Sequence, residues 1–403
     1  MIPFSPPKID QRIIDEVNDA LRSGWITTGP KTKLFEKNLI EYTGSKQVLC
    51  VNSATAGLEL MLRWFGLQPG DEVIIPAYTY CATANVVIHC GATPVMADIG
   101  DNFNVSLEAI ERLITPNTKA IMPVDIGGFP CDYEALNALV NRGDIKAKFT
   151  PNNEKQEQLG RMLILSDAAH SIGATYNGQR TGSVTDLAVF SFHAVKNLTT
   201  AEGGAIALNL PEPFDNRAIY EHLCITSLHG QSKDALAKSK KGGWRYDVIE
   251  AGYKFNMTDL QAAMGLVELA RYDEETLTRR KHIFDSYTEA FSAHDWAYLP
   301  IYETENKCSS YHLYLLRVKG ATEQQRDQII QEIFDQEVSV NVHYQPLPML
   351  SYYKNLGYKM EDYPQALATY QNEISLPVFY NLSDAEIQTV INAVVTAVDK
   401  VMG

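Results

Sequence analysis

The chain has 403 residues, with 35 Lys and Arg against 49 Asp and Glu, which gives a formal net charge of −14 at pH 7. Binding to a nucleic acid depends on basic side chains, so this balance, with no basic stripe to offset it, disfavours a nucleic-acid partner. The composition, 45% hydrophobic and 21% charged, is that of an ordinary globular protein. A chain of this length favours a large domain with a smaller companion.

The cysteines and the N-terminal sequence bear on the compartment. The six cysteines are scattered and show no CxxC or Cys/His ligand spacing, so we expect no metal site and a reducing environment. The first residues, MIPFSPPKIDQRIIDEV, lack the charged and then apolar pattern of a signal peptide. No run approaches the ~20 apolar residues of a membrane helix. The sequence therefore predicts a cytoplasmic protein with no membrane partner.

Strand-like and helix-like segments alternate from about residue 33 to about residue 265. Short apolar runs occupy 47–52, 71–76, 93–98, 119–124 and 161–166, and helical patterns occupy 55–66, 79–91, 106–115 and 131–141. In the first of these helices Leu58, Met61, Leu62 and Phe65 form an amphipathic stripe. Such alternation predicts an α/β fold, a mainly parallel sheet sandwiched by helices, with ligands beyond the carboxyl ends of the strands.

The last third of the chain has a different pattern. Strand-like runs at 310–318 and 337–344 flank a helix at 322–334, and the final helix begins with a capping box, Ser383 to Glu386. This pattern predicts a second, smaller α+β domain.

We therefore expect a large domain at 13–262 and a small C-terminal domain at 263–403. Residues 143–160 are polar and interrupt the alternation just before a buried strand. They are predicted to be a surface insertion at the face opposite the ligand site.

The chemistry is expected where two buried strands end. Asp167 follows one apolar run, and the next delivers Ser191, His193 and Lys196. A carboxylate and an amine at strand ends of one sheet suit pyridoxal phosphate, which needs a lysine for its Schiff base and an acid at its ring nitrogen. Each residue also has a simpler interpretation that is at least as good when it is considered alone. Asp167 could cap the next helix, and Lys196 could be a solvated loop residue.

A phosphate site is suggested by the segment NSATAGLEL, in which a strand ends, small residues follow, and a helix begins near Thr55. Free N–H groups at a helix N-terminus bind phosphate, although Ser53 or Thr55 could equally be an N-cap. Tyr78 and Tyr80 follow the next strand, where an aromatic ring could stack on a pyridine face or simply pack.

Together these motifs resemble a known family. SATAG, SDAAHSIGA, SFHAVKNLTTAEGGA, GYKFNMTDLQAAMGL and VHYQPLP occur in this order and are similar to those of the DegT/DnrJ/EryC1/StrS sugar aminotransferases. The resemblance covers nearly the whole chain and implies the fold of fold-type-I pyridoxal phosphate enzymes. It is strongest to enzymes that aminate a C4 keto group of a nucleotide-linked sugar, as in the 4-amino-4-deoxy-arabinose and pseudaminic acid pathways. Residues 143–160 depart from the family pattern.

The resemblance also implies roles for individual residues. Lys196 would form the Schiff base and transfer the proton, Asp167 would pair with the ring nitrogen, and His170 would lie near the ring. Asn256 would reach the phosphate from a neighbouring subunit, which implies a homodimer with shared sites. The remaining cofactor contacts would be Thr55, Ala56, Tyr80 and Ser191, and the substrate contacts would be Thr28, Lys31, His343 and Tyr344.

By resemblance the reaction moves an amino group from glutamate, through pyridoxamine phosphate, to a keto sugar for lipopolysaccharide or other cell-surface polysaccharide. Relatives that act as dehydratases carry histidine in place of Lys196, so the lysine argues against that alternative. A non-catalytic homologue would be expected to lack some cofactor groups. A nicotinamide oxidoreductase would need a GxGxxG motif after an early strand, and none is present. The sugar, its nucleotide and the carbon aminated are not fixed by sequence.

Overall fold

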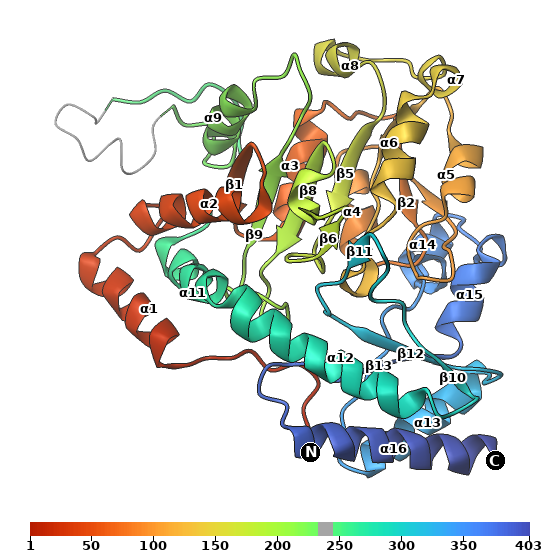
Figure 1. Cartoon of the computed structure of the whole chain (residues 1–403). Coiled ribbons are helices and arrows are strands. Elements are labelled where there is room, and N and C mark those ends of the chain that lie inside the picture. Colours follow the sequence, from red (N-terminus) through yellow and green to blue (C-terminus); the bar gives the residue numbers. More distant parts are fainter. Residues whose placement is uncertain (233–244) are drawn as a thin grey trace.

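The computed structural model describes residues 1–232 and 245–403, and its centre is a seven-stranded sheet with the order β1-β9-β8-β5-β4-β2-β3 (Figure 1). Only β9 runs antiparallel to its neighbours; the other strands share one direction. The predicted mainly parallel sheet is therefore confirmed. The strands are β1 (Gln47–Val51), β2 (Glu72–Pro76), β3 (Thr93–Ala97), β4 (Thr118–Ile121), β5 (Leu163–Asp167), β8 (Leu187–Ser191) and β9 (Gly204–Leu208).

Helices cover both faces of this sheet because successive side chains of its strands point to opposite faces and are apolar on both, as in β8. In β8, Leu187 and Val189 join the core that contains α3 (Ala54–Trp64) and α4 (Cys81–His89). Ala188 and Phe190, on the other face, join the core beneath α2 and α11. The covering helices of that second face are α2 (Pro30–Thr43), α5 (Leu107–Leu113), α6 (Tyr133–Asn141) and α11 (Asp259–Ala270). The predicted stripe of the first helix is wholly buried.

The predicted insertion contains two short helices, α7 (Gly143–Lys146) and α8 (Glu154–Leu159). Both lie at the top in Figure 1, where the chain enters β5 at its amino end. Gln156 of α8 donates a hydrogen bond to the carbonyl of Phe65 at 3.2 Å, which attaches the insertion to the end of α3. The carboxyl ends of the strands lie at the opposite edge of the sheet.

A second, antiparallel sheet with the order β10-β12-β13 packs against three helices in the C-terminal third of the chain (Figure 1). These elements are β10 (Ala297–Tyr298), β12 (Tyr314–Val318), β13 (Glu373–Leu376), α12 (Thr278–Phe291), α13 (Glu323–Asp335) and α16 (Asp384–Met402). The capping box of α16 is present as predicted.

The prediction of a strand at 337–344 is wrong. Val338 and Asn341 each form a single bridge, to Ile2 and to Ser375 respectively. The alternating valines do bury part of the segment, but the backbone changes partner within three residues and no ladder forms. The other short elements are α1 (Gln11–Ser23), β6 (Thr175–Tyr176), β7 (Gln179–Arg180), α9 (Asn216–Thr226), η3 (Tyr272–Leu277), β11 (Lys307–Cys308), α14 (Ser351–Asn355) and α15 (Pro364–Tyr370).

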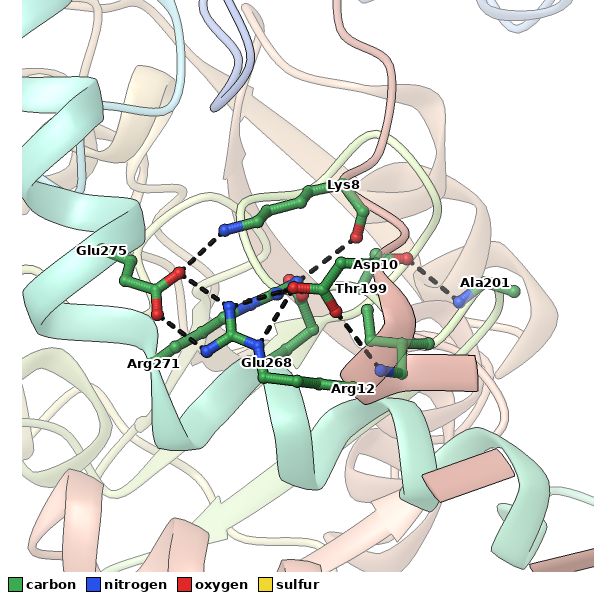
Figure 2. Close-up of polar contacts among 9 residues, drawn as sticks. Lys8, Asp10, Arg12, Thr199, Ala201, Glu268, Arg271 and Glu275 are labelled. Carbon is green, nitrogen blue, oxygen red and sulfur yellow. Dashed lines mark hydrogen bonds and ion pairs between the residues drawn. The ribbon is translucent and has the colours of Figure 1, made fainter. Parts of the chain in front are cut away.

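The first ten residues form an arm that crosses from the second sheet to α11. Phe4 of the arm stacks on the ring of His343, with centroids 5.4 Å apart. At its far end the arm joins an ion cluster (Figure 2). We use that name for the six side chains of Lys8, Asp10, Arg12, Glu268, Arg271 and Glu275. Within the described residues, no helix is long and apolar enough to cross a membrane.

Candidate active site

A cavity of about 390 Å³ lies at the carboxyl ends of β5 and β8, within the range of ~300–1,000 Å³ typical of small-molecule sites. Many of its lining residues are those predicted from sequence, namely Thr55, Tyr80, Asp167, His170, Ser191, Lys196, His343 and Tyr344. In the part of the chain that the structure describes, no group of three or more His, Cys, Asp or Glu could hold a metal ion.

Lys196 and Asp167 line the same cavity and shift each other's ionisation. Burial lowers the pKa of the Lys196 amine to about 8, and the Asp167 carboxylate opposes this change. Burial also raises the pKa of Asp167, against the effects of its hydrogen bonds and of Lys196. The site thus holds an amine that loses its proton more easily than usual beside a buried carboxyl group whose pKa is raised.

Asp167 is fixed at the end of β5 by two donors. The hydroxyl of Thr83, in α4, donates to Oδ2 at 2.9 Å, and the backbone N–H of Ala169 donates to Oδ1 at 3.3 Å. The buried carboxylate of Asp125 lies behind it and raises its pKa further. Asp167 therefore has one orientation, set by a helix on one side and a turn on the other.

His170 is buried and held at both ring nitrogens. Nδ1 accepts a hydrogen bond from the N–H of Gly127 at 3.3 Å, so Nε2 carries the proton that it donates to the Tyr344 hydroxyl at 3.0 Å. Burial, with the nearby Lys196 amine, holds the pKa of His170 well below its usual range. His170 is accordingly a neutral ring with a fixed tautomer beside the cavity.

The start of α3, where a phosphate site is predicted, has backbone N–H groups next to the cavity. Ser53 caps the helix by accepting from the N–H of Ala56 at 3.1 Å. The N–H groups of Ala54 and Thr55, at the first two helical positions, precede any intrahelical acceptor. Gly204 of β9 allows the strand to approach, because a Cβ there would lie 2.6 Å from the nitrogen of Ala54. Ser191 lines the same end of the cavity.

Two tyrosines flank the mouth of the cavity. The ring of Tyr80 lies 5.8 Å from that of Tyr344, at an interplanar angle of 46°. Tyr80 is 59% exposed, which leaves one face of its ring open. His343 lies beside Tyr344, and its ring faces the cavity on one side and Phe4 on the other.

The structure does not bring the other predicted residues into this cavity. Thr28 donates to the carbonyl of Met257 at 2.6 Å and accepts from the amide of Asn256 at 2.7 Å. Lys31 pairs with Glu16 and, at 2.8 Å, with Asp19. Ala56 is buried, and Ser53 already satisfies its N–H. The roles of Thr28, Lys31, Ala56 and Asn256 in binding stay predictions, as do the roles of the residues that line the cavity.

Several residues that support the site were missed from the sequence. Thr83 lies in the segment that was singled out for its tyrosines, one helical turn after Thr79. His312 donates from Nδ1 to Asn197 at 2.8 Å, and its ring lies 4.4 Å from that of His170. A polar residue at the edge of an apolar strand, as in SYHLYLL, is the signal that could have pointed to His312.

Comparison with known proteins identifies relatives along the whole chain. The sequence profile of the DegT/DnrJ/EryC1/StrS aminotransferase family matches residues 7–148 and 154–395, so its gap falls inside the predicted insertion. The spore coat polysaccharide biosynthesis protein SpsC of Bacillus subtilis is 38% identical over 402 residues, which is 98% of this chain and 96% of SpsC.

Solved structures agree with this match. The sugar aminotransferase Spr1654 of Streptococcus pneumoniae, in its PMP form, is 48% identical with a TM-score of 0.96 and full coverage of both chains. The same protein has been solved in a PLP form, at 47% identity and a TM-score of 0.94. PseC of Helicobacter pylori, an aminotransferase of pseudoaminic acid biosynthesis, is 28% identical with a TM-score of 0.87 over 99% of each chain.

Proposed function

This chain belongs to the DegT/DnrJ/EryC1/StrS aminotransferase family, and from that premise we propose that it moves an amino group from glutamate to the C4 keto group of a nucleotide-linked sugar. The coarser statement, a sugar aminotransferase that uses pyridoxal phosphate, follows from the family and from Spr1654 in its PLP and PMP forms. The carbon aminated, the nucleotide and the amino donor are the proposal.

The chain's own groups fit this cofactor. The cavity holds an amine with a lowered pKa, a carboxyl group with a raised pKa, and a helix N-terminus with two free N–H groups approached closely by Gly204. These are a lysine for the aldehyde, an acid for the ring nitrogen and an anion site for the phosphate. Thr55 and Ser191 would add hydroxyl donors to the phosphate, and Tyr80 would cover one ring face.

When bound, pyridoxal phosphate supplies an electron sink that stabilises a carbanion next to the amino group. Asp167, as a carboxylate held by Thr83 and by the N–H of Ala169, would accept a hydrogen bond from the protonated ring nitrogen and stabilise its charge. Lys196 would take the α-proton of the amino donor and deliver it to the carbon of the cofactor. Because the pKa of Lys196 is about 8, an appreciable fraction of the amine is neutral near physiological pH and able to act as a base.

A homodimer with shared sites is part of the proposal. Asn256 does not line the cavity of its own chain, and its amide donates to the hydroxyl of Thr28 at 2.7 Å. The chain also exposes the apolar side chains of Ile14, Leu21, Ile26, Leu34, Val248 and Ile249. Exposed apolar side chains of this size are available for an interface. A second chain would bring its own Asn256 to the phosphate.

The substrate proposal rests on the open side of the cavity. His343 and Tyr344 line it beyond the predicted cofactor contacts, and they offer the hydrogen-bonding groups that a sugar requires. SpsC and PseC, which act in polysaccharide and in pseudoaminic acid biosynthesis, support a cell-surface polysaccharide such as lipopolysaccharide as the destination. Thr28 and Lys31 would contact the sugar nucleotide from a neighbouring chain, and a cytoplasmic location stays a prediction.

The single observation that carries the proposal is the pairing of Lys196 with Asp167 in one cavity. It also weighs against a dehydratase of the same family, which would lack this lysine. The test is the absorption spectrum of the purified holoenzyme before and after addition of L-glutamate. We expect a yellow protein whose absorption is lost with glutamate and restored with 2-oxoglutarate.

Lys196→Ala is the informative variant, and Lys148→Ala, an exposed lysine in the insertion on the opposite face of the sheet, is its matched control. The Lys196 variant should show no glutamate response, whereas the control should behave as the wild type. A wild-type protein that stays colourless when pyridoxal phosphate is supplied would contradict the proposed function. A yellow protein that ignores glutamate but responds to another amino acid would contradict only the donor.

A further inference from the structure

A row of three side chains lies behind the substrate side of the cavity. The hydroxyl of Ser375, in β13, lies 2.5 Å from Oε1 of Glu373 and 2.9 Å from Nδ1 of His343. The second carboxylate oxygen of Glu373 accepts from the backbone N–H of His343 at 3.0 Å. Glu373 and Ser375 are both fully buried, so water does not compete for these contacts.

The Ser375 hydroxyl has one proton, so it can donate either to Glu373 or to His343 but not to both. If Glu373 is a carboxylate, Ser375 donates to it and must accept from His343, which places the imidazole proton on Nδ1. If Glu373 is protonated, it donates to Ser375, which then donates to Nδ1, and the imidazole proton moves to Nε2. The state of Glu373 is therefore linked to the tautomer of His343 through one hydroxyl.

The surroundings of Glu373 put its titration in an accessible range. Burial raises its pKa to about 8, against the effects of Ser375, the His343 N–H and the guanidinium groups of Arg326 and Arg317. The Arg326 guanidinium, from α13, donates to the backbone carbonyl of Glu373 at 3.1 Å. Tyr78 and Tyr344 also face this side, and burial together with the Glu373 carboxylate raises the pKa of both hydroxyls. Tyr78 donates to the carbonyl of His343 at 2.8 Å.

His343 stays neutral while this happens. Burial, with the amine of Lys196 nearby, lowers its pKa to about 4, well below the range in which Glu373 titrates. Phe4 stacks on the ring at 5.4 Å, and Nδ1 is held by Ser375. Among the described residues Nε2 has no hydrogen-bond partner, and the ring lines the cavity. Nε2 is thus the atom that is left for a ligand.

We propose that Glu373 and Ser375 are positioning residues that set the tautomer of His343 and so decide whether Nε2 accepts a hydrogen bond from the substrate or donates one. With Glu373 ionised, Nε2 is a bare acceptor suited to a hydroxyl group of a sugar. With Glu373 protonated, Nε2–H is a donor suited to a carbonyl or carboxylate oxygen. The identity of the ligand rests on the proposed function, whereas the tautomer depends only on this chain.

The test is ¹⁵N NMR of the holoenzyme labelled at histidine, recorded from pH 6 to pH 10, with a His343→Asn variant to assign the resonances. In the wild type we expect the protonated nitrogen of His343 to change from Nε2 to Nδ1 as the pH rises, over about two pH units centred near 8. In Glu373→Gln the amide can donate to Ser375 at every pH, so Nε2 should stay protonated throughout. In Ser375→Ala the hydroxyl that links Glu373 to His343 is absent, so the tautomer of His343 should not change with pH.

Glu386→Gln is the matched control, since Glu386 also accepts from a serine, Ser383, at 2.7 Å, but in α16 with no histidine in the row. It should keep the wild-type change. A His343 whose tautomer is the same from pH 6 to pH 10, or a change that persists in Glu373→Gln, would overturn the inference. Loss of the glutamate response in the absorption spectrum, with the tautomer change intact, would instead count against the proposed function alone.

Discussion

At the scale of single residues, the acid of the site depends on a threonine. Burial alone makes Asp167 a weak acid, and the hydroxyl of Thr83 offsets part of that effect by donating to Oδ2 at 2.9 Å. The same hydrogen bond fixes the direction in which the other oxygen points. Asp167 needs both effects to pair with a ring nitrogen. The carboxyl group must be ionised, and one of its oxygens must point at that nitrogen.

Thr83→Val keeps the shape of this buried side chain and removes the hydroxyl. We expect pyridoxal phosphate to bind about 10- to 100-fold more weakly, since a hydrogen bond to a charged group contributes about 1.5–3 kcal/mol. Equilibrium titration of the apoenzyme, followed by absorption, measures the dissociation constant.

Thr389→Val is the control for that substitution. Thr389 is also in a helix and also uses its hydroxyl within the protein, donating to the carbonyl of Ala385 at 3.0 Å, but it is exposed in α16. Its cofactor affinity should equal that of the wild type. Equal affinities for wild type and Thr83→Val would mean that Asp167 does not need its threonine partner.

At the scale of elements, the sequence predicted most strands of the large sheet and most of the helices that cover it. The signals for these elements, apolar periodicity and capping residues, lie within a few residues of one another. They did not predict the place or direction of β9, since Gly204–Leu208 is a five-residue strand whose pairing with β1 and β8 is set by contacts far along the chain. For the same reason, the row from Glu373 to His343 is invisible in sequence. Thirty positions separate those two residues.

The N-terminal arm is another element whose place depends on distant contacts. Arg271 is 4% exposed and pairs with Glu268, which is 3% exposed, and with Asp10 of the arm at 2.6 Å (Figure 2). Arg271→Met should reduce the free energy of unfolding by about 3–5 kcal/mol, because it leaves the carboxylate of Glu268 buried without a partner. Urea unfolding measures this loss.

A double variant separates the buried pair from the attachment of the arm. Arg271→Met with Glu268→Leu should recover most of the stability, since no buried charge remains unpaired. Amide hydrogen exchange in residues 2–10 should nevertheless stay faster than in the wild type, because the contact with Asp10 is still absent. Arg217→Met, which removes an exposed pair with Glu221, should cost no more than about 1 kcal/mol. Slow exchange of the arm in the double variant would show that the contact between Arg271 and Asp10 does not hold it.

At the scale of the whole molecule, one chain lines the cavity and leaves apolar side chains exposed around it. Tyr80 is exposed at the mouth, and the apolar side chains of α1 and of the segment before Asn256 also face outward. In Figure 1, α1 lies at the edge of the molecule beside α2 and α11. Two chains placed about a twofold axis would cover these surfaces reciprocally, and each would complete the site of the other.

Complementation between two inactive variants tests this arrangement. Lys196→Ala lacks the base, and Asn256→Ala lacks the amide that we expect to reach the phosphate of the partner. In a mixed dimer one site would have both residues intact and the other would have neither, so random reassociation should restore about a quarter of the wild-type glutamate response at limiting cofactor. The measurement is the glutamate-dependent loss of absorption after the two proteins are unfolded and refolded together. If Asn256 served its own chain, every site in the mixture would lack one residue and no activity would return.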